Sequence, residues 1–131
     1  MKSKIWSIFL SVCIIALLVS ACSSSGNKPF KDLKSEEIAS ASVLLVPPGK
    51  TVNIDDVEQL TKYLNDIEIY ERDDSYVDYC GQSITFYIKK TDGSELKVFD
   101  NNSFIVIDDI GYRCEYAPAE ALSNYANSLI K

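Results

Sequence analysis

The residues that could do chemistry in this sequence are cysteines and carboxylates, because the chain contains no histidine. The usual general base, the Ser-His-Asp triad and the commonest zinc ligand are therefore missing. Cys80 and Cys114 have no imidazole to activate them. Two thiols also do not complete a structural zinc site, which takes four ligands. The sequence predicts a non-enzymatic protein with no catalytic residue, no metal site and no cofactor.

Carboxylates gather in two turn-like segments, one with Asp73, Asp74 and Asp78 and one with Asp108 and Asp109. Neither segment has the ligand spacing of an EF-hand calcium loop. Aspartate is common in turns because its side chain hydrogen-bonds to nearby backbone. Solvated turns are the preferred interpretation, and a calcium-binding or small enzyme domain is kept as an alternative hypothesis.

The first residues have the pattern of an export signal. Met1 to Lys4 is a short basic start, and Ile5 to Val19 is an apolar run interrupted only by Ser7 and Ser11. A membrane-spanning helix usually needs about 20 apolar residues. This run is shorter and is followed by small residues, which favours a cleavable signal peptide over a membrane span.

The segment Val19-Ser20-Ala21-Cys22 resembles the lipobox of bacterial lipoproteins. In that family the cysteine receives a diacylglycerol, and the chain is cut before it. The resemblance implies a signal peptide at 1–21, lipidation at Cys22 and a lipid anchor on the extracytoplasmic face of the cell membrane. Residues 22–29 would then be the lipidated cysteine and a flexible tether, and 30–131 a single domain. The alternative is an ordinary secretory signal with a chance cysteine.

An exported domain with an even number of remaining cysteines favours a disulfide. Once Cys22 is lipidated and Cys13 is removed with the signal, Cys80 and Cys114 are left. We therefore predict that these two residues form a disulfide. The alternative is a pair of separate buried thiols, since free cysteine behaves as a small hydrophobic residue.

The periodicity of the apolar residues and the positions of turn residues indicate the secondary structure. A first strand is expected at 38–46, ended by Pro47-Pro48-Gly49. Asp55 is expected to begin a helix with a capping-box-like signature, and 67–71 alternates like a second strand. The segment 76–82 could continue that strand or form a loop.

Residues 83–116 predict a meander of four antiparallel strands, with Asp92-Gly93 as a hairpin turn and Asp108 to Gly111 as another tight turn. Tyr112, Cys114 and Tyr116 are expected on one face of the last strand. Pro118 suits the first turn of a closing helix.

The expected fold class is therefore α+β: one antiparallel sheet in the order β-α-β-β-β-β-β-α, with two helices packed on one face. The other face is left to polar and aromatic side chains. They are Thr85, Tyr87, Lys89, Lys97 and Arg113.

Net charge and aromatic content limit the classes of partner that this protein could bind. The formal net charge is −6 and there is no basic stripe, which argues against nucleic-acid binding. Four of the eight tyrosines cluster in the middle of the chain: Tyr70, Tyr76, Tyr79 and Tyr87. Tyrosine is enriched in contact surfaces, so these four are predicted to bind a partner. The alternative is that they reflect strand propensity and the edge of the core.

Several short segments of the mature chain resemble a Firmicutes domain of unknown function. That domain occurs in small lipoproteins and is also appended to antirepressor receptors of the beta-lactam-sensing type. The segments are Ile38 to Ala41, Lys62 to Ile67, Gly81-Gln82 with Thr85-Phe86, Thr91 to Gly93, and Ile107-Asp108 with Gly111 to Arg113. The resemblance implies an extracytoplasmic accessory or sensing module and supplies no catalytic residues.

The expected function is a membrane-anchored, non-enzymatic binding or sensing module with an envelope protein as its possible partner. A lipoprotein that inhibits, or gives immunity to, an extracellular enzyme is the main alternative.

Overall fold

The computed structural model describes residues 26–130. The predicted signal peptide (1–21) and Cys22 lie outside this range. Within it, no helix has the length and apolar character needed to cross a membrane. The elements, with η for a 3₁₀ helix, are η1 (Ser35–Glu37), β1 (Ile38–Val46), β2 (Lys50–Asn53), α2 (Val57–Asp66), β3 (Ile69–Arg72), η2 (Asp74–Asp78), β4 (Ser83–Lys90), β5 (Glu95–Asp100), β6 (Phe104–Ile107), β7 (Ile110–Cys114) and α3 (Tyr116–Ser128).

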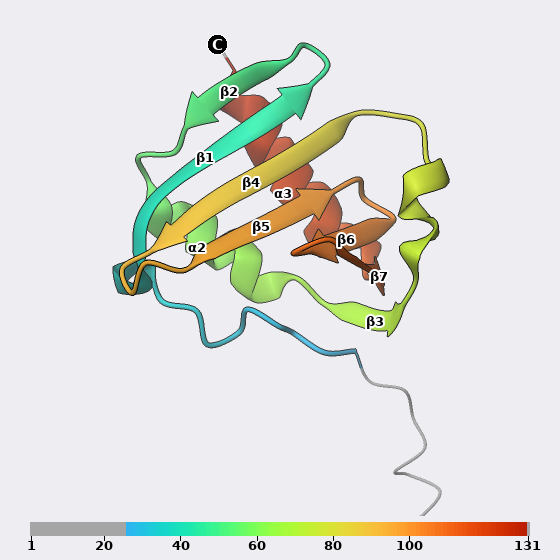
Figure 1. Cartoon of the computed structure of the whole chain (residues 1–131), viewed down its shortest axis with the longest axis horizontal. Coiled ribbons are helices and arrows are strands. Elements are labelled where there is room, and N and C mark those ends of the chain that lie inside the picture. The colour runs from blue at the N-terminus through green and yellow to red at the C-terminus, as the bar shows by residue number, and fades with distance from the viewer. Residues whose placement is uncertain (1–25, 131) are drawn as a thin grey trace, which may run out of the picture.

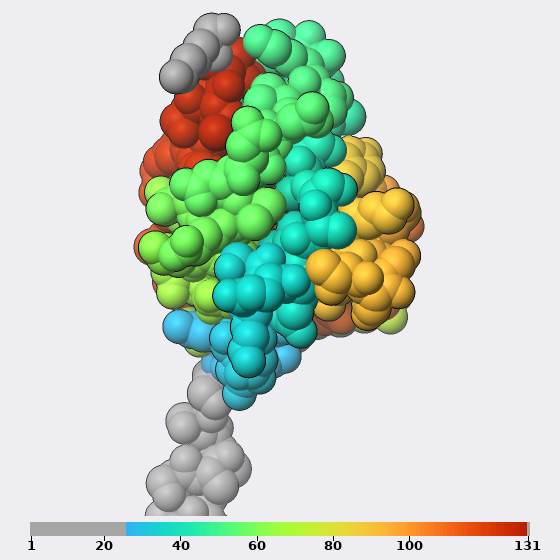
Figure 2. Space-filling view, turned by 90° about the vertical axis from the view of Figure 1, so that its left-hand side faces the viewer, coloured from blue at the N-terminus to red at the C-terminus, as the bar shows by residue number. Residues whose placement is uncertain are grey.

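The strands form one seven-stranded sheet in the order β2-β1-β4-β5-β6-β7-β3, and all neighbours are antiparallel. Both α-helices lie behind the sheet in the view of Figure 1. The side view shows α2 beside α3 in one layer and the strands in the other (Figure 2). This confirms the predicted α+β class with two helices on one face.

The predicted meander forms because its apolar residues alternate and its turns suit tight hairpins. Ile84, Phe86 and Ile88 of β4 are all buried. Asp108 and Asp109 both have positive φ, at 49° and 71°. Positive φ at both central residues is what a two-residue hairpin loop with the twist of the flanking strands requires.

The core lies between the sheet and the helices. It contains Val43, Leu45, Phe86, Leu60, Leu64 and Leu122, among others. Burying one such side chain contributes roughly 1.5–3 kcal/mol of transfer free energy. Tyr63 of α2 stacks on Tyr125 of α3, with ring centroids 4.8 Å apart. The two helices therefore contact each other as well as the sheet.

Strand β2 was not predicted. The chain turns at Gly49, with φ 85° and its N–H donating to the Leu45 carbonyl, and returns antiparallel to β1. Only Val52 of β2 is half-buried. A four-residue edge strand that buries so little has almost no hydrophobic period, which explains why the sequence did not indicate it.

Both helix starts differ slightly from prediction. The N-cap of α2 is Asp56 rather than Asp55, and its side chain accepts from the Gln59 N–H at 3.0 Å. Helix α3 begins at Tyr116, so this residue does not belong to the last strand as expected. Tyr112 and Cys114 do pack against the core on the predicted face.

Candidate functional site

The sheet face opposite the helices is divided into two halves. Along β6, Phe104 and Val106 alternate with residues of the helix-side core, yet both are buried. The segment that covers them is η2 with its flanking residues. The Tyr76 ring lies 6.0 Å from that of Phe99, and the Tyr79 ring lies 5.2 Å from that of Phe104.

We call this covered part, over Phe99, Phe104, Val106 and Gly111, the capped half. The remainder over β1, β4 and the start of β5 is the open half; its outward residues are Ser40, Ser42, Tyr87, Lys89, Glu95 and Lys97. The prediction that this whole face is exposed is therefore wrong for Thr85, which is buried beside the capped half.

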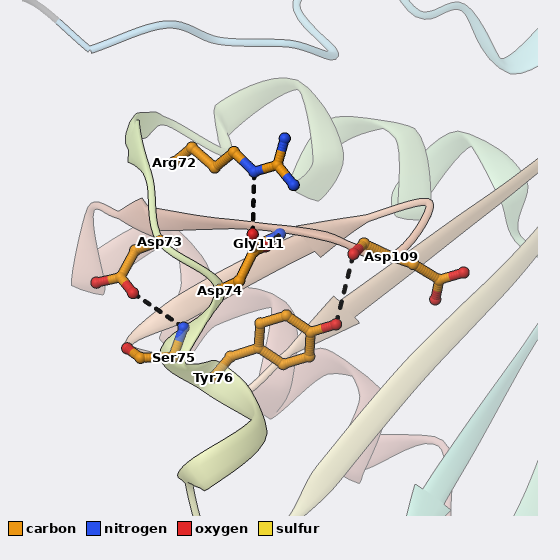
Figure 3. A network of polar contacts seen from close by, with 7 residues as sticks. All are labelled: Arg72, Asp73, Asp74, Ser75, Tyr76, Asp109 and Gly111. Carbon is orange, nitrogen blue, oxygen red and sulfur yellow. Dashed lines mark hydrogen bonds and ion pairs between the residues drawn. The ribbon is translucent and has the colours of Figure 1, made fainter.

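Asp74 ties η2 to the sheet (Figure 3). The Gly111 N–H of β7 donates to Asp74 Oδ1 at 2.9 Å, and Arg72 Nε donates to Asp74 Oδ2 at 3.0 Å. The hydrogen bond from the Gly111 backbone is the main cause that lowers the pKa of Asp74. The carboxylate is thus used as an acceptor that fixes the cap.

Asp73 makes a second set of contacts. The Ser75 N–H donates to Asp73 Oδ1 at 3.0 Å, and Arg113 Nε donates to Oδ2 at 2.8 Å. The hydrogen bonds from Ser75 are the main cause that lowers the pKa of Asp73 to about 2. In residues 26–130, no three His, Cys, Asp or Glu side chains are placed to hold a metal ion.

Gly111 allows the cap to approach closely. A Cβ at this position would collide with the Asp73 carbonyl oxygen and lie 2.6 Å from Cδ1 of Tyr76. The Asp73 N–H in turn donates to the Gly111 carbonyl at 2.9 Å. The absence of a side chain at position 111 of β7 is therefore required for η2 to lie on the sheet.

The structure does not bring the four predicted contact tyrosines together. Tyr76 and Tyr79 belong to the cap. Tyr87 stands on the open half and is 44% exposed. Tyr70 lies on the edge strand β3, where its hydroxyl donates to Glu115 Oε2 at 2.6 Å. That hydrogen bond is the main cause that raises the pKa of Tyr70 to about 12. A contact role for the four remains a prediction, and Tyr87 is the member best placed for it.

The open half is hollowed into a shallow groove of about 580 Å³ over β1, β4 and β5, with Ser40, Ser42, Tyr87 and Lys89 in its lining. A smaller hollow of about 230 Å³ shares Tyr87 and Lys97 with it and reaches the cap. Lys97 is fixed between them, because its Nζ lies 3.0 Å from Asp109 Oδ1. This hydrogen bond raises the pKa of Lys97.

Cys80 and Cys114 are free thiols in the structure, so their predicted disulfide stays a prediction. Cys80 is exposed in the loop before β4. Cys114 is partly buried at the end of β7, with its Sγ 3.6 Å from the Asn102 carbonyl oxygen. Burial raises the pKa of the Cys114 thiol to about 12. A thiol with so high a pKa is a poor nucleophile at neutral pH.

No protein-family model matches this chain, and neither a curated protein nor a solved structure matches it. The lipobox and the likeness to an extracytoplasmic domain therefore rest on the sequence alone.

The sequence indicated part of the open half. Tyr87, Lys89 and Lys97 were placed on the exposed face by the alternation of β4 and β5. Ser40 and Ser42 were not singled out, although the alternation of β1 places both opposite Ala41 and Val43. Small hydroxyl residues at every second position of a central strand are a usable signal for a face without a packed layer.

Proposed function

We propose that this protein is a membrane-anchored extracytoplasmic binding module that engages an envelope protein through the open half of its sheet. The observation that carries the proposal is the contrast within one face. Over β6, the outward Phe104 and Val106 are buried beneath the cap. Over β1 and β4, serine, tyrosine and lysine side chains stay accessible as a groove, and the outward Leu44 and Val46 of β1 continue beyond it without a cover.

The path of the chain supports this orientation. Asn27 bridges to Ile69 of β3, with both backbone hydrogen bonds made at 2.8 and 2.7 Å. The described chain thus enters at the β3 edge, whereas the open half lies toward β2 at the opposite edge (Figure 1). With Cys22 as a lipid anchor, the β3 edge is the one nearest the anchor along the chain, and the open half lies toward the other edge, where a partner can reach it.

The chemistry of the groove indicates the partner. Tyr87 offers a ring and a wet hydroxyl, the combination that contact surfaces favour. Lys89 has no ion-pair partner within 4.0 Å among residues 26–130, although Glu95 stands opposite it in register. Its ammonium is available in an otherwise acidic protein. A partner segment that brings a carboxylate to Lys89 and an apolar group to Tyr87 fits this surface.

The test is quantitative co-purification of the envelope partner after cross-linking in intact bacteria. The double variant Tyr87→Ala, Lys89→Ala is expected to lose most of the recovered partner. Tyr116→Ala is the matched control, because Tyr116 is 54% exposed on α3 and outside the groove. Equal recovery from the two variants would contradict docking on the open half.

The anchor is tested separately with Cys22→Ala. Two or more acyl chains give stable membrane binding, whereas none gives no anchor. We expect the variant to lose radiolabelled palmitate. Label retained on Cys22→Ala would exclude lipidation at this residue.

A further inference from the structure

A second hollow, separate from the open half, lies at the end of the sheet beside the second half of α3. It has a volume of about 300 Å³, at the lower end of the range for small-molecule sites. Its walls come from the loop before β4, the β5–β6 turn and α3. Its polar lining consists mainly of Gln82, Asn101, Asn102, Ser123, Asn124 and Asn127.

The lining contains no charged side chain but has many amides. Each amide offers both donors and an acceptor, which suits a neutral ligand with alternating hydroxyl groups. Gln82 and Asn127 pair with each other at 2.9 and 3.1 Å, which holds both amides in fixed orientations. A fixed set of polar groups costs less entropy to bind a ligand than a mobile one.

Two of these amides keep hydrogen-bonding capacity. Asn101 Oδ1 accepts hydrogen bonds from the Ser103 and Phe104 N–H groups, at 3.2 and 2.8 Å. The side-chain nitrogen of Asn101 is therefore left to donate hydrogen bonds to a ligand. The side chain of Asn124 makes no hydrogen bond within residues 26–130 and is exposed. Both donors and acceptors are thus available at the mouth of the pocket.

The floor of the pocket is fixed by a buried polar chain. Ser123 Oγ lies 2.9 Å from Asp100 Oδ2 and 2.7 Å from Asn102 Oδ1, and the Asn102 N–H donates to Asp100 Oδ1 at 2.8 Å. Asp100 is fully buried beneath α3. Its carboxyl group therefore organises the residues of the pocket without entering it.

Aromatic surface completes the site. Tyr79 lines the pocket and is 56% exposed, and the half-buried Phe99 also lines it. A sugar ring combines hydroxyl edges for the amides with an apolar C–H face for such surfaces. We propose that this pocket binds one ring of a neutral saccharide, held by the side-chain amides of Asn101 and Asn124. The proposal does not depend on docking at the open half.

The experiment is an NMR titration of the full-length protein, purified in detergent, that follows its side-chain amide resonances. The probes are N-acetylglucosamine and glucose. Diglycine, which is not a sugar, and glucuronate, which is a charged sugar, are titrated separately for comparison. The neutral sugars are expected to give saturable shifts at the pocket amides. Asn124→Ala is expected to weaken binding roughly three- to tenfold, the range for one lost neutral hydrogen bond.

Asn53→Ala is the matched control, since Asn53 is exposed on β2 and does not line this pocket. It is expected to leave the sugar affinity unchanged. Asn124→Ala should stay folded, because alanine favours a helix and no hydrogen bond is lost. The proposal is overturned if neither sugar gives saturable shifts, if diglycine or glucuronate binds as tightly, or if Asn124→Ala retains full affinity.

Discussion

The capped and open halves lie on the same face of the sheet but have different surroundings. On the capped half, the outward residues of β5 and β6 are Phe99, Phe104 and Val106, and η2 lies over them. On the open half, the groove is lined by the outward serines of β1 and by Tyr87 and Lys89 of β4, and no segment of residues 26–130 caps it; Leu44 and Val46 follow the serines along β1. The difference teaches that this chain covers the aromatic rings on its sheet face, those of Phe99 and Phe104, with its own residues. The open half, which the chain leaves uncovered, is accessible to water or to a partner.

The largest expected effect comes from Phe104→Ala. Phe104 is fully buried between Tyr79 and Arg113, and its removal should leave a cavity beneath the cap. We expect a loss of about 3–5 kcal/mol in the free energy of unfolding, measured by urea denaturation. Tyr87→Ala, on the open half, should cost about 1 kcal/mol or less. Similar losses for the two variants would remove the distinction between the halves.

Two carboxyl groups on opposite faces of the sheet are expected to make the stability of the protein depend on pH in opposite directions. Burial raises the pKa of Asp100 to about 7, from 3.8, on the helix side. The folded state then binds a proton that the unfolded state has lost. This group's contribution to stability is therefore greatest in acid and falls as pH rises from about 4 to 7. The slope is at most about 1.4 kcal/mol per pH unit.

Asp73 in the cap behaves in the opposite way. Its folded pKa, about 2, lies below the ordinary 3.8. Its contribution is present above about pH 4 and is lost as pH falls toward 2. Urea denaturation of Asp100→Asn across this range should lack the decline between pH 4 and 7 and keep the acid loss due to Asp73. An unchanged decline in Asp100→Asn would show that Asp100 is not its source.

Gly111→Ala tests the close approach of the cap. The new methyl group would meet the Asp73 carbonyl and the Tyr76 ring, so η2 must move outward. We expect a loss of about 1–3 kcal/mol, as for other overpacked sites. Hydrogen exchange should become faster at Asp73 and Ser75, with β4 unchanged. Unaltered protection of these amides would mean that the cap has room to spare.

The smallest effect is expected from Arg113→Ala. Arg113 lies 4.6 Å from the centroid of the Phe104 ring and pairs with Asp73, but about half of its side chain is exposed. Exposed ion pairs and cation–π contacts contribute up to about 1 kcal/mol each. Arg72→Ala is the control, because Arg72 is more exposed and, among residues 26–130, pairs only with Asp74. Thermal melting should rank Arg113→Ala as the more destabilised of the two.

Much of the fold could be predicted because its signals are local. The alternation of Ile84, Phe86 and Ile88 indicated β4, and Asp92-Gly93 indicated the β4–β5 hairpin. Both depend on neighbouring residues only. Strand β2 escaped prediction because it is short, and what identifies it is pairing with β1 rather than its own pattern.

The cap and the amide pocket could not be predicted because they depend on contacts between distant segments. The segment 76–82 has no period of its own, and only the apolar Phe104 and Val106 on the outward face of β6 indicate that a cover is needed. Asp100 was not singled out, although its alternation with Leu96 and Val98 places it on the helix side. Its partner Ser123 is 23 residues away, on another element.

The most direct test of the account is site-specific photo-crosslinking in intact bacteria from four exposed positions. Tyr87 reports on the open half, Val77 on the cap, Tyr70 on the β3 edge and Tyr116 on α3. We predict that a cross-linker at position 87 captures one envelope protein and that those at 77, 70 and 116 do not. Capture from position 77 or 116 but not from 87, or no capture from any position on a folded and membrane-anchored protein, would contradict binding through the open half.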